Sequence, residues 1–378
     1  MRVAIVGAGP AGLYLSYLLK RRSRLADVCV FEQNTAGATF GFGVVFSERA
    51  LEFLREDDPE TYDAITPAME SWSDIKLDLE GRVVTIDGVG FSAVGRLEFL
   101  QLLQERVQTV GVPVKFEHSI GALDEVKDAD LIVGADGVNS LVRRTHENEF
   151  GATVRFLTNK FAWYGTNQRF DTLTQTFRRN SDGAFNAHHY RYSPRMSTFI
   201  VETDSATWLR AGFASMDEPA TKAYLERVFA DVLDGHGLLL NKSLWRNFPM
   251  IANRRWSTRN AVLLGDALHA AHFSIGSGTR LAMEDAIALA DAIETHPSDA
   301  AAAIHSYEAA RRPILDKLTT AANMSADWYE HFPDHMKLPP LEFAMSYITR
   351  SGRVDLNRLR AVSPKFVAAY EQYCRTRT

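Results

Sequence analysis

VAIVGAGPAGLYLSYLLKRRSRLADVCVFE, residues 3–32, is the stretch that decides the fold. An apolar run, Val3–Val6, is followed by the motif GAGPAG at Gly7–Gly12, by a helix-forming segment over 13–20 and by a second apolar run that ends in Glu32. This is the pattern G-x-G-x-x-G in the context of strand, turn, helix and strand that a dinucleotide-binding unit requires. The stretch therefore predicts a Rossmann-type domain.

The glycines and the acidic residue of this stretch each have a physical reason. Gly7 permits a tight turn, Gly9 lets a pyrophosphate approach the backbone, and Gly12 lets the helix pack closely on the strand. Glu32 comes 20 residues after Gly12, where a carboxylate accepts hydrogen bonds from an adenosine ribose and repels the 2′-phosphate of NADP. The chain has one such motif, which indicates one tightly held dinucleotide, FAD or NAD. If that dinucleotide is FAD, a nicotinamide cofactor used together with it would bind only briefly.

A second strand, turn and helix pattern lies at residues 261–290, AVLLGDALHAAHFSIGSGTRLAMEDAIALA. Asp266 follows an apolar run, and a loop rich in glycine leads into helical spacing from Leu281. An Asp in this place accepts from ligand hydroxyls, while free N–H groups at the helix start face negative charge. An ordinary Gly-Asp turn is the alternative, and the motif at the N-terminus favours the ligand.

Three further segments leave a ligand role open. GADG at Gly134–Gly137 follows an apolar strand and is either a ligand turn or a plain Asp-Gly turn. Arg96 begins a helix expected to run to Val110, where it contacts a phosphate or ribose or is simply exposed. The stretch TFGFGVVF, Thr39–Phe46, is either a mobile loop near a ring or a buried turn.

The middle of the chain predicts an antiparallel sheet. β-branched and aromatic residues fill the segments 160–167, 173–178, 187–192 and 197–202, and a helix is expected over 218–233. The aromatic residues either wall a pocket or pack in a core: Trp163, Tyr164, Phe177, Phe185, Tyr190, Tyr192 and Phe199. The arginines are either a patch for a phosphorylated tail or solvated edge charges: Arg178, Arg179, Arg191 and Arg195.

These patterns predict an α/β fold of two interleaved domains with a helical C-terminal part. We expect a dinucleotide domain over 1–70, 92–150 and 256–298, a substrate domain over 71–91 and 151–255, and helices over 299–378. In the last part, residues 300–328 have a helical pattern apart from Pro313.

Composition excludes several classes of protein. Of 378 residues, 46% are hydrophobic and 24% are charged, as in globular proteins, and a net charge of −5 argues against a nucleic-acid partner. Cys29 and Cys374 form no C-x-x-C pair, so we expect no disulfide, no zinc site and a reducing, cytoplasmic setting. The opening apolar run is too short for a signal peptide, and no run approaches membrane-spanning length. His269 and His272 lack a third ligand, so no metal is expected.

The order of these motifs along the chain resembles the single-component flavoprotein aromatic hydroxylases, the family of para-hydroxybenzoate hydroxylase. Many members have a proline pair where this chain has His272-Phe273, in AHFSIGSGT at 271–279. That phrase, with RLAMEDAIALADAI after it, is similar to the salicylyl-CoA 5-hydroxylase and 2-aminobenzoyl-CoA monooxygenase group. NKFAWYGTNQRFD at 159–171 and MSTFIVE at 196–202 also resemble the violacein-pathway hydroxylase.

The resemblance implies which residues bind FAD and which face the substrate. Gly7, Gly9, Ala11 and Gly12 would hold the pyrophosphate, Glu32 the adenosine ribose, Arg96 the cofactor, Asp266 the ribityl chain, and Gly276, Gly278 and Thr279 the pyrimidine edge. The candidates for the catalytic pocket are His188, Tyr190 and His272. His188 and His189 are adjacent, so only one of them faces the ring if the segment is a strand.

The activity implied is an FAD-dependent monooxygenase that hydroxylates an aromatic acyl-CoA thioester with O2 and transient NADH or NADPH. A helix N-terminus suits the anionic edge of reduced flavin, and a base near a ring hydroxyl makes the ring more electron-rich. The alternatives are a hydroxylase of a tryptophan-derived indole pigment precursor, a flavin-dependent reductase without oxygen chemistry, and a non-catalytic nucleotide-binding protein.

Overall fold

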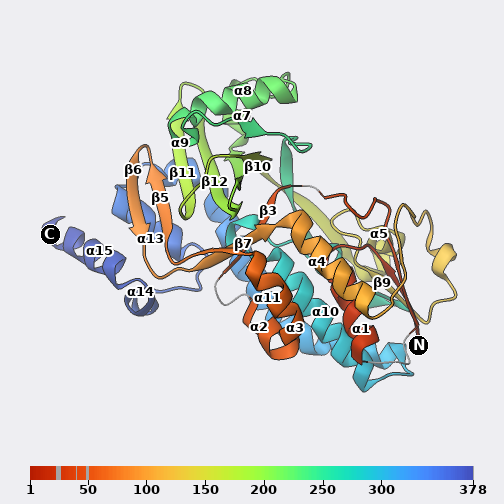
Figure 1. Cartoon of the computed structure of the whole chain (residues 1–378). Coiled ribbons are helices and arrows are strands. Elements are labelled where there is room, and N and C mark those ends of the chain that lie inside the picture. Colours follow the sequence, from red (N-terminus) through yellow and green to blue (C-terminus); the bar gives the residue numbers. More distant parts are fainter. Residues whose placement is uncertain (23–26, 40, 48–50, 378) are drawn as a thin grey trace.

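Two large sheets and one small one organise the chain (Figure 1). The computed structural model describes residues 1–22, 27–39, 41–47 and 51–377. The six-stranded sheet has the order β16 (Ser257–Thr258), β17 (Ala261–Leu263), β9 (Leu131–Gly134), β1 (Arg2–Val6), β2 (Asp27–Phe31) and β8 (Val114–Lys115). Its strands are parallel except β16 at the edge, and residues 2–22 and 27–31 form the strand, turn, helix and second strand that the sequence predicts.

Helices cover the six-stranded sheet and share one apolar core with it. They are α1 (Pro10–Arg22), α4 (Arg96–Thr109), α10 (Gly278–Thr295) and the first half of α11 (Ala300–Glu330). The short helix α3 (Pro59–Ile65) lies against α4, and α2 (Glu52–Asp57) lies against α3. The Rossmann-type arrangement follows from this packing, because parallel strands need crossover helices to cover their faces.

The larger sheet forms the middle of the chain. Its order is β14 (Leu238–Leu239), β10 (Ala152–Thr166), β13 (Met196–Thr203), β12 (Gly183–Ser193), β11 (Leu173–Asn180), β5 (Ile75–Leu79) and β6 (Arg82–Ile86), and β15 (Arg246–Asn253) pairs with β10. The pairs are antiparallel except β11 with β5. The segments predicted as strands are confirmed in position, and β10 is much longer than its predicted part, 160–167.

The two faces of this sheet have different neighbours. His189 and Phe199 lie on the face covered by α7 (Ser205–Arg210), α8 (Glu218–Val228) and α9 (Ala230–Leu233). Residues that alternate with them, such as His188, point to the opposite face, towards the six-stranded sheet and the C-terminal helices. The single helix expected over 218–233 is broken at Phe229, whose backbone is not helical.

A small sheet connects the two large ones. It consists of β3 (Gly43–Ser47), β7 (Phe91–Gly95) and β4 (Glu70–Trp72). The stretch 39–46 was expected to be a loop or a buried turn; residue 40 lies outside the described residues, and from Gly43 onwards the stretch is strand β3. The prediction of loop structure was therefore wrong for its second half, because β7 pairs with it along its length.

The C-terminal helices are α11, α12 (Phe332–His335), α13 (Pro340–Thr349), α14 (Leu356–Val362) and α15 (Pro364–Arg377). The helix runs through Pro313, where the sequence suggests an interruption. Next to it, Arg311 donates to Asp285 of α10 at 2.8 Å, and this buried contact holds the helix across the proline. In the described part of the chain no helix is long and apolar enough to cross a membrane.

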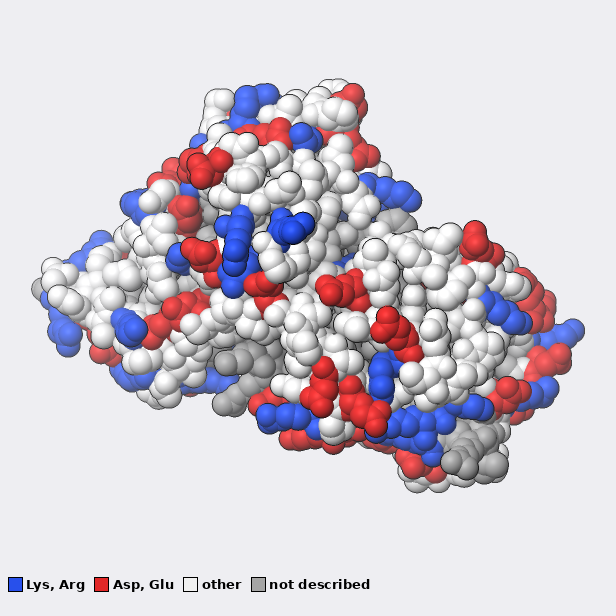
Figure 2. All heavy atoms as spheres, viewed as in Figure 1, with Lys and Arg blue, Asp and Glu red and all other residues white. Residues whose placement is uncertain are grey.

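A buried ionic cluster fixes the turn that carries Asp266. Asp285 accepts from His269 Nε2 at 2.7 Å, from Arg311 Nε at 2.8 Å and from the backbone N–H of Gly265 at 3.1 Å. Burial acts to raise the pKa of Asp285, but His269 and Arg311 outweigh burial and lower it. The surface is mixed in charge: Figure 2 shows acidic and basic side chains interspersed over the face in view.

Candidate active site

A cavity of about 780 Å³ lies where the two large sheets meet. Its walls come from segments that are far apart in the sequence: the glycine turn before α1, the start of α4, the loop after β9, the turn after β17, the start of α10, and strands β10, β12, β13 and β15. The structure therefore brings together the N-terminal motif and the distant loop at 261–290 on one cavity.

In the glycine turn, Gly7 and Gly12 allow close packing of the backbone, and Gly9 faces open space. Gly7 has φ of +105°, and a Cβ there would lie 2.4 Å from the carbonyl oxygen of Ala135. A Cβ on Gly12 would lie 2.0 Å from the carbonyl oxygen of Gly7, whereas a Cβ on Gly9 would meet no atom within 4 Å. Gly9 and Ala11 line the cavity; Gly7 and Gly12 lie behind them and let strand and helix approach.

Glu32 lies beside this turn but not in the wall of the cavity. Its carboxylate accepts from the N–H of Ala8 at 2.9 Å and from the N–H of Asn34 at 2.8 Å. A carboxylate has lone pairs for further donors, so these bonds leave acceptor capacity for a ribose. The bond to Ala8 also gives Glu32 a structural role in the turn that the sequence does not reveal.

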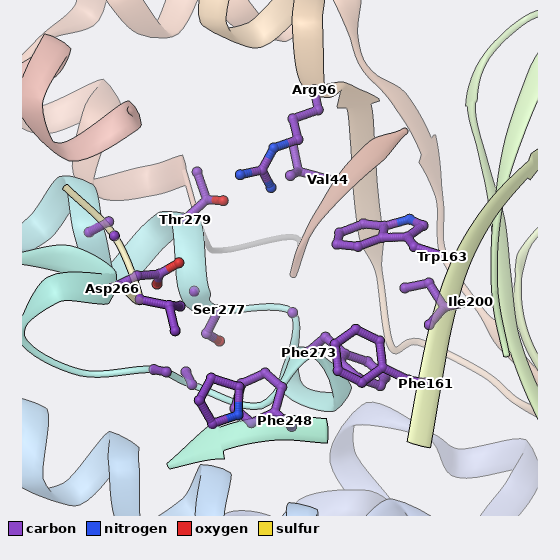
Figure 3. Close-up of a pocket in the computed structure, with 18 of the residues that line it drawn as sticks. Val44, Arg96, Phe161, Trp163, Ile200, Phe248, Asp266, Phe273, Ser277 and Thr279 are labelled. Atoms are coloured by element: carbon purple, nitrogen blue, oxygen red, sulfur yellow. The ribbon is translucent and has the colours of Figure 1, made fainter. Parts of the chain in front are cut away.

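Arg96 and Asp266 lie on opposite sides of the cavity, with Thr279 near both (Figure 3). Neither charged side chain has a hydrogen-bonding partner among the described residues. Burial lowers the pKa of Arg96, and Asp266 and Tyr190 act in the opposite direction. Burial likewise raises the pKa of Asp266, against the effects of His269 and Arg96. Two such unpaired charges in one cavity indicate a ligand that bonds to them.

The start of α10 forms the third side of this region. Gly276, Ser277, Gly278 and Thr279 line the cavity, and no side chain caps the helix there. Gly276 has φ of +57°, which turns the chain into the helix. The free N–H groups of the first turn and the dipole of an 18-residue helix provide a positive potential at this wall.

The other end of the cavity is mostly aromatic and apolar. Phe161, Trp163 and Ile200 come from the larger sheet, and Phe248 and Phe273 come from β15 and the loop before α10 (Figure 3). The ring centroids of Phe161 and Phe273 are 5.2 Å apart. This end of the cavity suits a flat apolar ring.

His188 and Tyr190 present polar groups in this apolar end. Burial and the charge of Arg350 lower the pKa of His188 to about 3, so its ring is neutral at physiological pH. Tyr190 donates its hydroxyl to the carbonyl oxygen of Gly43 at 3.0 Å, and burial raises its pKa. Neither ring nitrogen of His188 has a partner in the described residues.

His272, the third pocket candidate, does not line the cavity. Its Nδ1 bonds the hydroxyl of Ser274 at 2.8 Å, and its ring packs against Phe273, Phe248 and Tyr329. The ring caps the short turn that starts at Phe273 and is 2% exposed. The position of His272 therefore does not support direct contact with a substrate.

Comparisons with known proteins agree with this geometry. The family model described as "FAD binding domain" matches residues 116–322, and that described as "NAD(P)-binding Rossmann-like domain" matches residues 5–45. Salicyloyl-CoA 5-hydroxylase of Streptomyces sp is 41% identical over 93% of this chain and 70% of the relative. A 3-hydroxy-4-methyl-anthranilyl-[aryl-carrier protein] 5-monooxygenase of Streptosporangium sibiricum is 37% identical over 94% and 95%.

The chain belongs to the FAD-dependent aromatic monooxygenases. Protodeoxyviolaceinate monooxygenase of Chromobacterium violaceum is a further member, 34% identical over 93% of this chain and 94% of the relative. The structure of PqsL, a probable FAD-dependent monooxygenase from Pseudomonas aeruginosa, shares the fold with a TM-score of 0.69 and 20% identity over 92% of this chain and 100% of PqsL. The para-hydroxybenzoate-hydroxylase-like fold and the use of FAD and NAD(P)H are thus confirmed.

The residues around the cavity of this monooxygenase fit FAD. The open space over Gly9 suits a pyrophosphate. The unpaired Asp266 and Arg96 suit a polyhydroxyl chain. The helix start at Gly278 suits an anionic ring edge. Bound FAD supplies the redox chemistry with O2, and the chain supplies position and exclusion of water.

Other wall residues were missed or left open by the sequence. Phe248 was not foreseen, because nothing local shows that β15 pairs with β10 about 90 residues earlier. In the GADG turn, Asp136 accepts from the N–H of Leu141 at 2.6 Å and so caps a helix, while Gly137 lines the cavity. The arginines of the proposed patch lie outside the cavity wall: Arg178, Arg179, Arg191 and Arg195.

Proposed function

We propose that this monooxygenase hydroxylates an aromatic ring that is carried as a coenzyme A thioester, as salicylyl-CoA is, with electrons from NADH or NADPH. The observation that carries the proposal is the apolar, aromatic end of the cavity beside the cofactor residues, with His188 as its unpartnered polar group. Two relatives are named for ring acids held on a carrier, coenzyme A in one case and an aryl-carrier protein in the other.

The proposed roles of the site residues follow the geometry. Gly9, Ala11, Asp266 and the turn at 276–279 would hold FAD, with Arg96 on the opposite side. His188 would accept or donate a hydrogen bond at the hydroxyl or amino group of the substrate ring, while the aromatic side chains exclude water. Tyr190 keeps its proton at neutral pH because burial raises its pKa, so it would position the ring rather than act as a base.

The rim of the cavity offers a place for the tail of such a substrate. Phe156 and Arg246 line the cavity and are both exposed, and the guanidinium of Arg246 has no partner in the part of the chain that the structure describes. An apolar side chain beside a free cation suits a pantetheine arm that ends in phosphates. This rim, rather than the four arginines of the larger sheet, would hold the coenzyme A tail.

A second candidate is hydroxylation of an indole pigment precursor. The observation that favours it is the 34% identity to protodeoxyviolaceinate monooxygenase over nearly the whole chain. The aromatic end of the cavity suits an indole as well as a benzene ring.

Substrate assays of the FAD-loaded protein separate these candidates. We expect salicylyl-CoA to stimulate NADH or NADPH oxidation and O2 uptake with a matching yield of hydroxylated thioester, and free salicylate or an indole carboxylic acid to do so at least about tenfold less efficiently. Equal or better use of a free acid or an indole would contradict the proposal. NADH oxidation without ring hydroxylation for all substrates would point to a reductase instead.

A variant at the rim tests the tail. Arg246→Gln should raise the KM for salicylyl-CoA about 5- to 30-fold, because a charge-assisted hydrogen bond contributes about 1–2 kcal/mol at an exposed site. The KM for salicylyl-N-acetylcysteamine, which lacks the phosphates, should not change. Arg155→Gln, on the neighbouring strand β10 and outside the cavity wall, is the matched control.

A further inference from the structure

An arginine near the end of the chain contacts the loop that carries the cofactor side of the cavity. Arg350 follows α13, and its Nη2 donates to the carbonyl oxygen of Ser274 at 2.7 Å. Its Nε donates to Ser325 Oγ of α11 at 2.9 Å, and its Nη1 donates to the carbonyl oxygen of Tyr347 at 2.6 Å. The guanidinium also lies over the ring of Tyr347, with Cζ 3.8 Å from the ring centroid. Arg350 thus joins α11, α13 and the loop before α10 in one place.

The loop that Arg350 holds is part of the cavity wall. Ser274 is buried and lies between two residues that line the cavity, Phe273 and Gly276. Its hydroxyl lies 2.8 Å from Ser325 Oγ, so its side chain and its backbone are both fixed by groups behind the wall. The first turn of α10, with its free N–H groups, begins shortly after Ser274. The direction of these N–H groups therefore depends on how the loop is attached to Arg350.

Arg350 also brings a positive charge behind this wall. Its three acceptors are neutral oxygens, and none of the carboxylates in the described part of the chain forms an ion pair with it. The charge acts on the cavity, because burial and then the charge of Arg350 lower the pKa of His188, a residue of the cavity wall. The same two causes lower the pKa of His272. A negative charge in the cavity is therefore stabilised by the field that disfavours a proton on His188.

We propose that Arg350 is a positioning residue for the flavin. It holds the loop before α10 so that the N–H groups of the first turn face the pyrimidine edge of bound FAD, and it places a positive charge behind them. Reduced flavin is anionic at that edge, so both effects favour the reduced over the oxidised cofactor. The C-terminal helices, none of whose described residues lines the cavity, thereby act on the cofactor. This role depends on the use of FAD and not on which aromatic ring is hydroxylated.

The first test is the redox behaviour of the FAD-loaded protein without an aromatic substrate. Arg350→Gln removes the charge and shortens the side chain, so we expect the preference for reduced over oxidised FAD to fall about tenfold. For a two-electron couple this is a midpoint potential about 30 mV more negative. Anaerobic titration against a reference dye measures the potential, and the Kd for oxidised FAD should rise about 3- to 10-fold. A purely structural role would weaken the binding of both redox states equally, and the resulting unchanged potential would overturn the proposal.

Arg350→Lys separates the charge from the hydrogen bonds. An ammonium group keeps the charge but cannot reach three acceptors in the fixed geometry of a guanidinium. We expect the Kd for oxidised FAD to rise about 3- to 10-fold, as in Arg350→Gln, while the preference for reduced FAD changes less than about threefold. Arg360→Gln is the matched control, since Arg360 of α14 donates to Glu371 of α15 at 2.8 Å, and it should leave both quantities unchanged. A potential as negative in Arg350→Lys as in Arg350→Gln would contradict the role of the charge.

The second test follows the loop itself in the protein saturated with FAD. The backbone N–H groups of Ile275 and Gly276 donate within the turn, to the carbonyl oxygens of His272 at 3.3 Å and Phe273 at 3.0 Å. Hydrogen exchange in peptides that cover 272–279, measured by mass spectrometry, should be at least about tenfold faster in both Arg350 variants and unchanged in Arg360→Gln. Exchange as slow as in the wild type in Arg350→Lys, the milder variant, would overturn the proposal even if Arg350→Gln does not fold.

Discussion

Asp266 is the residue whose surroundings most clearly require a ligand. Its carboxylate faces the cavity, has no hydrogen-bonding partner among the described residues and lies across from an equally unpaired Arg96. Two opposite charges that do not reach each other are costly in a folded protein unless something bonds to both. The hydroxyls of a ribityl chain would satisfy the carboxylate.

Replacing Asp266 should therefore weaken FAD binding without unfolding the protein. Asp266→Ala is expected to raise the Kd for FAD about 10- to 100-fold, since a hydrogen bond to a charged group contributes about 1.5–3 kcal/mol. Fluorescence quenching of added FAD measures the Kd, and thermal melting of the apoprotein should be unchanged or slightly raised. Unaltered FAD affinity would remove Asp266 from the site.

Some site residues could be predicted from the sequence, and the position of others could not. The resemblance to the flavoprotein aromatic hydroxylases implies one cofactor site, and the structure places on the cavity the residues Gly9, Ala11, Arg96, Asp266, Gly276, Gly278 and Thr279. It could not anticipate that His272 turns its ring into a packed cluster, because that depends on Phe248 and Tyr329 from distant strands and helices. Whether these residues act as proposed is still a prediction.

At the scale of elements, the turn before α1 has one glycine that folding requires, Gly12, and one that ligand binding requires, Gly9. Gly12→Ala places a Cβ 2.0 Å from a backbone oxygen, so we expect the free energy of unfolding to fall by about 2–3 kcal/mol or the protein not to accumulate. Gly9→Ala meets no protein atom within 4 Å, so the apoprotein should melt normally while its affinity for FAD drops at least about tenfold. Normal FAD binding by Gly9→Ala would mean that the pyrophosphate lies elsewhere.

Two carboxylates of α10 hold Arg311 of α11: the fully buried Asp285 at 2.8 Å and Glu284 at 2.9 Å. Asp285→Asn leaves Arg311 paired with Glu284 alone and removes the charge that His269 faces, so the free energy of unfolding should fall by about 3 kcal/mol, measured by urea denaturation at pH 7. Because the pKa of Asp285 is lowered in the folded protein, this stabilisation is present above the unfolded value near 4 and is lost as pH falls below it. Asp291→Asn, exposed on the same helix and paired with Arg22, should cost less than about 1 kcal/mol.

For the whole molecule, buried neutral histidines make stability depend on pH. The pKa values of His188 and His272 are lowered to about 3 in the folded protein by burial, against about 6.5 in the unfolded chain. The unfolded state therefore binds more protons below pH 6.5, and stability falls with acidity. From pH 7.5 to 5 the two residues should remove about 4 kcal/mol. Urea unfolding at several pH values measures the loss. The buried His189, whose pKa is also lowered, adds to it, and His272→Asn should reduce it by about 2 kcal/mol.

For the whole molecule, the fold class could be predicted from the sequence, but the pairing of segments far apart in the chain could not. Periodicity and motif order indicated a Rossmann-type sheet, an antiparallel sheet and C-terminal helices, and the fold confirms that class. The third sheet was not foreseen, because the pairing of β3 with β7 joins residues about 50 positions apart and leaves no local pattern. The continuity of α11 through Pro313 was likewise decided by tertiary contacts that outweigh the local preference.

Helix α11 spans about 46 Å at the usual rise per residue. Its first half contributes Ile304, Tyr307 and Leu315 to the core beside the six-stranded sheet, and its end contributes Trp328 and Tyr329 to the core beside the larger one. Because α11 is packed into both cores, it restrains the two layers against moving relative to each other. Substrate and nicotinamide must therefore gain entry by small local displacements at the rim, and the two layers should melt together in a single calorimetric transition.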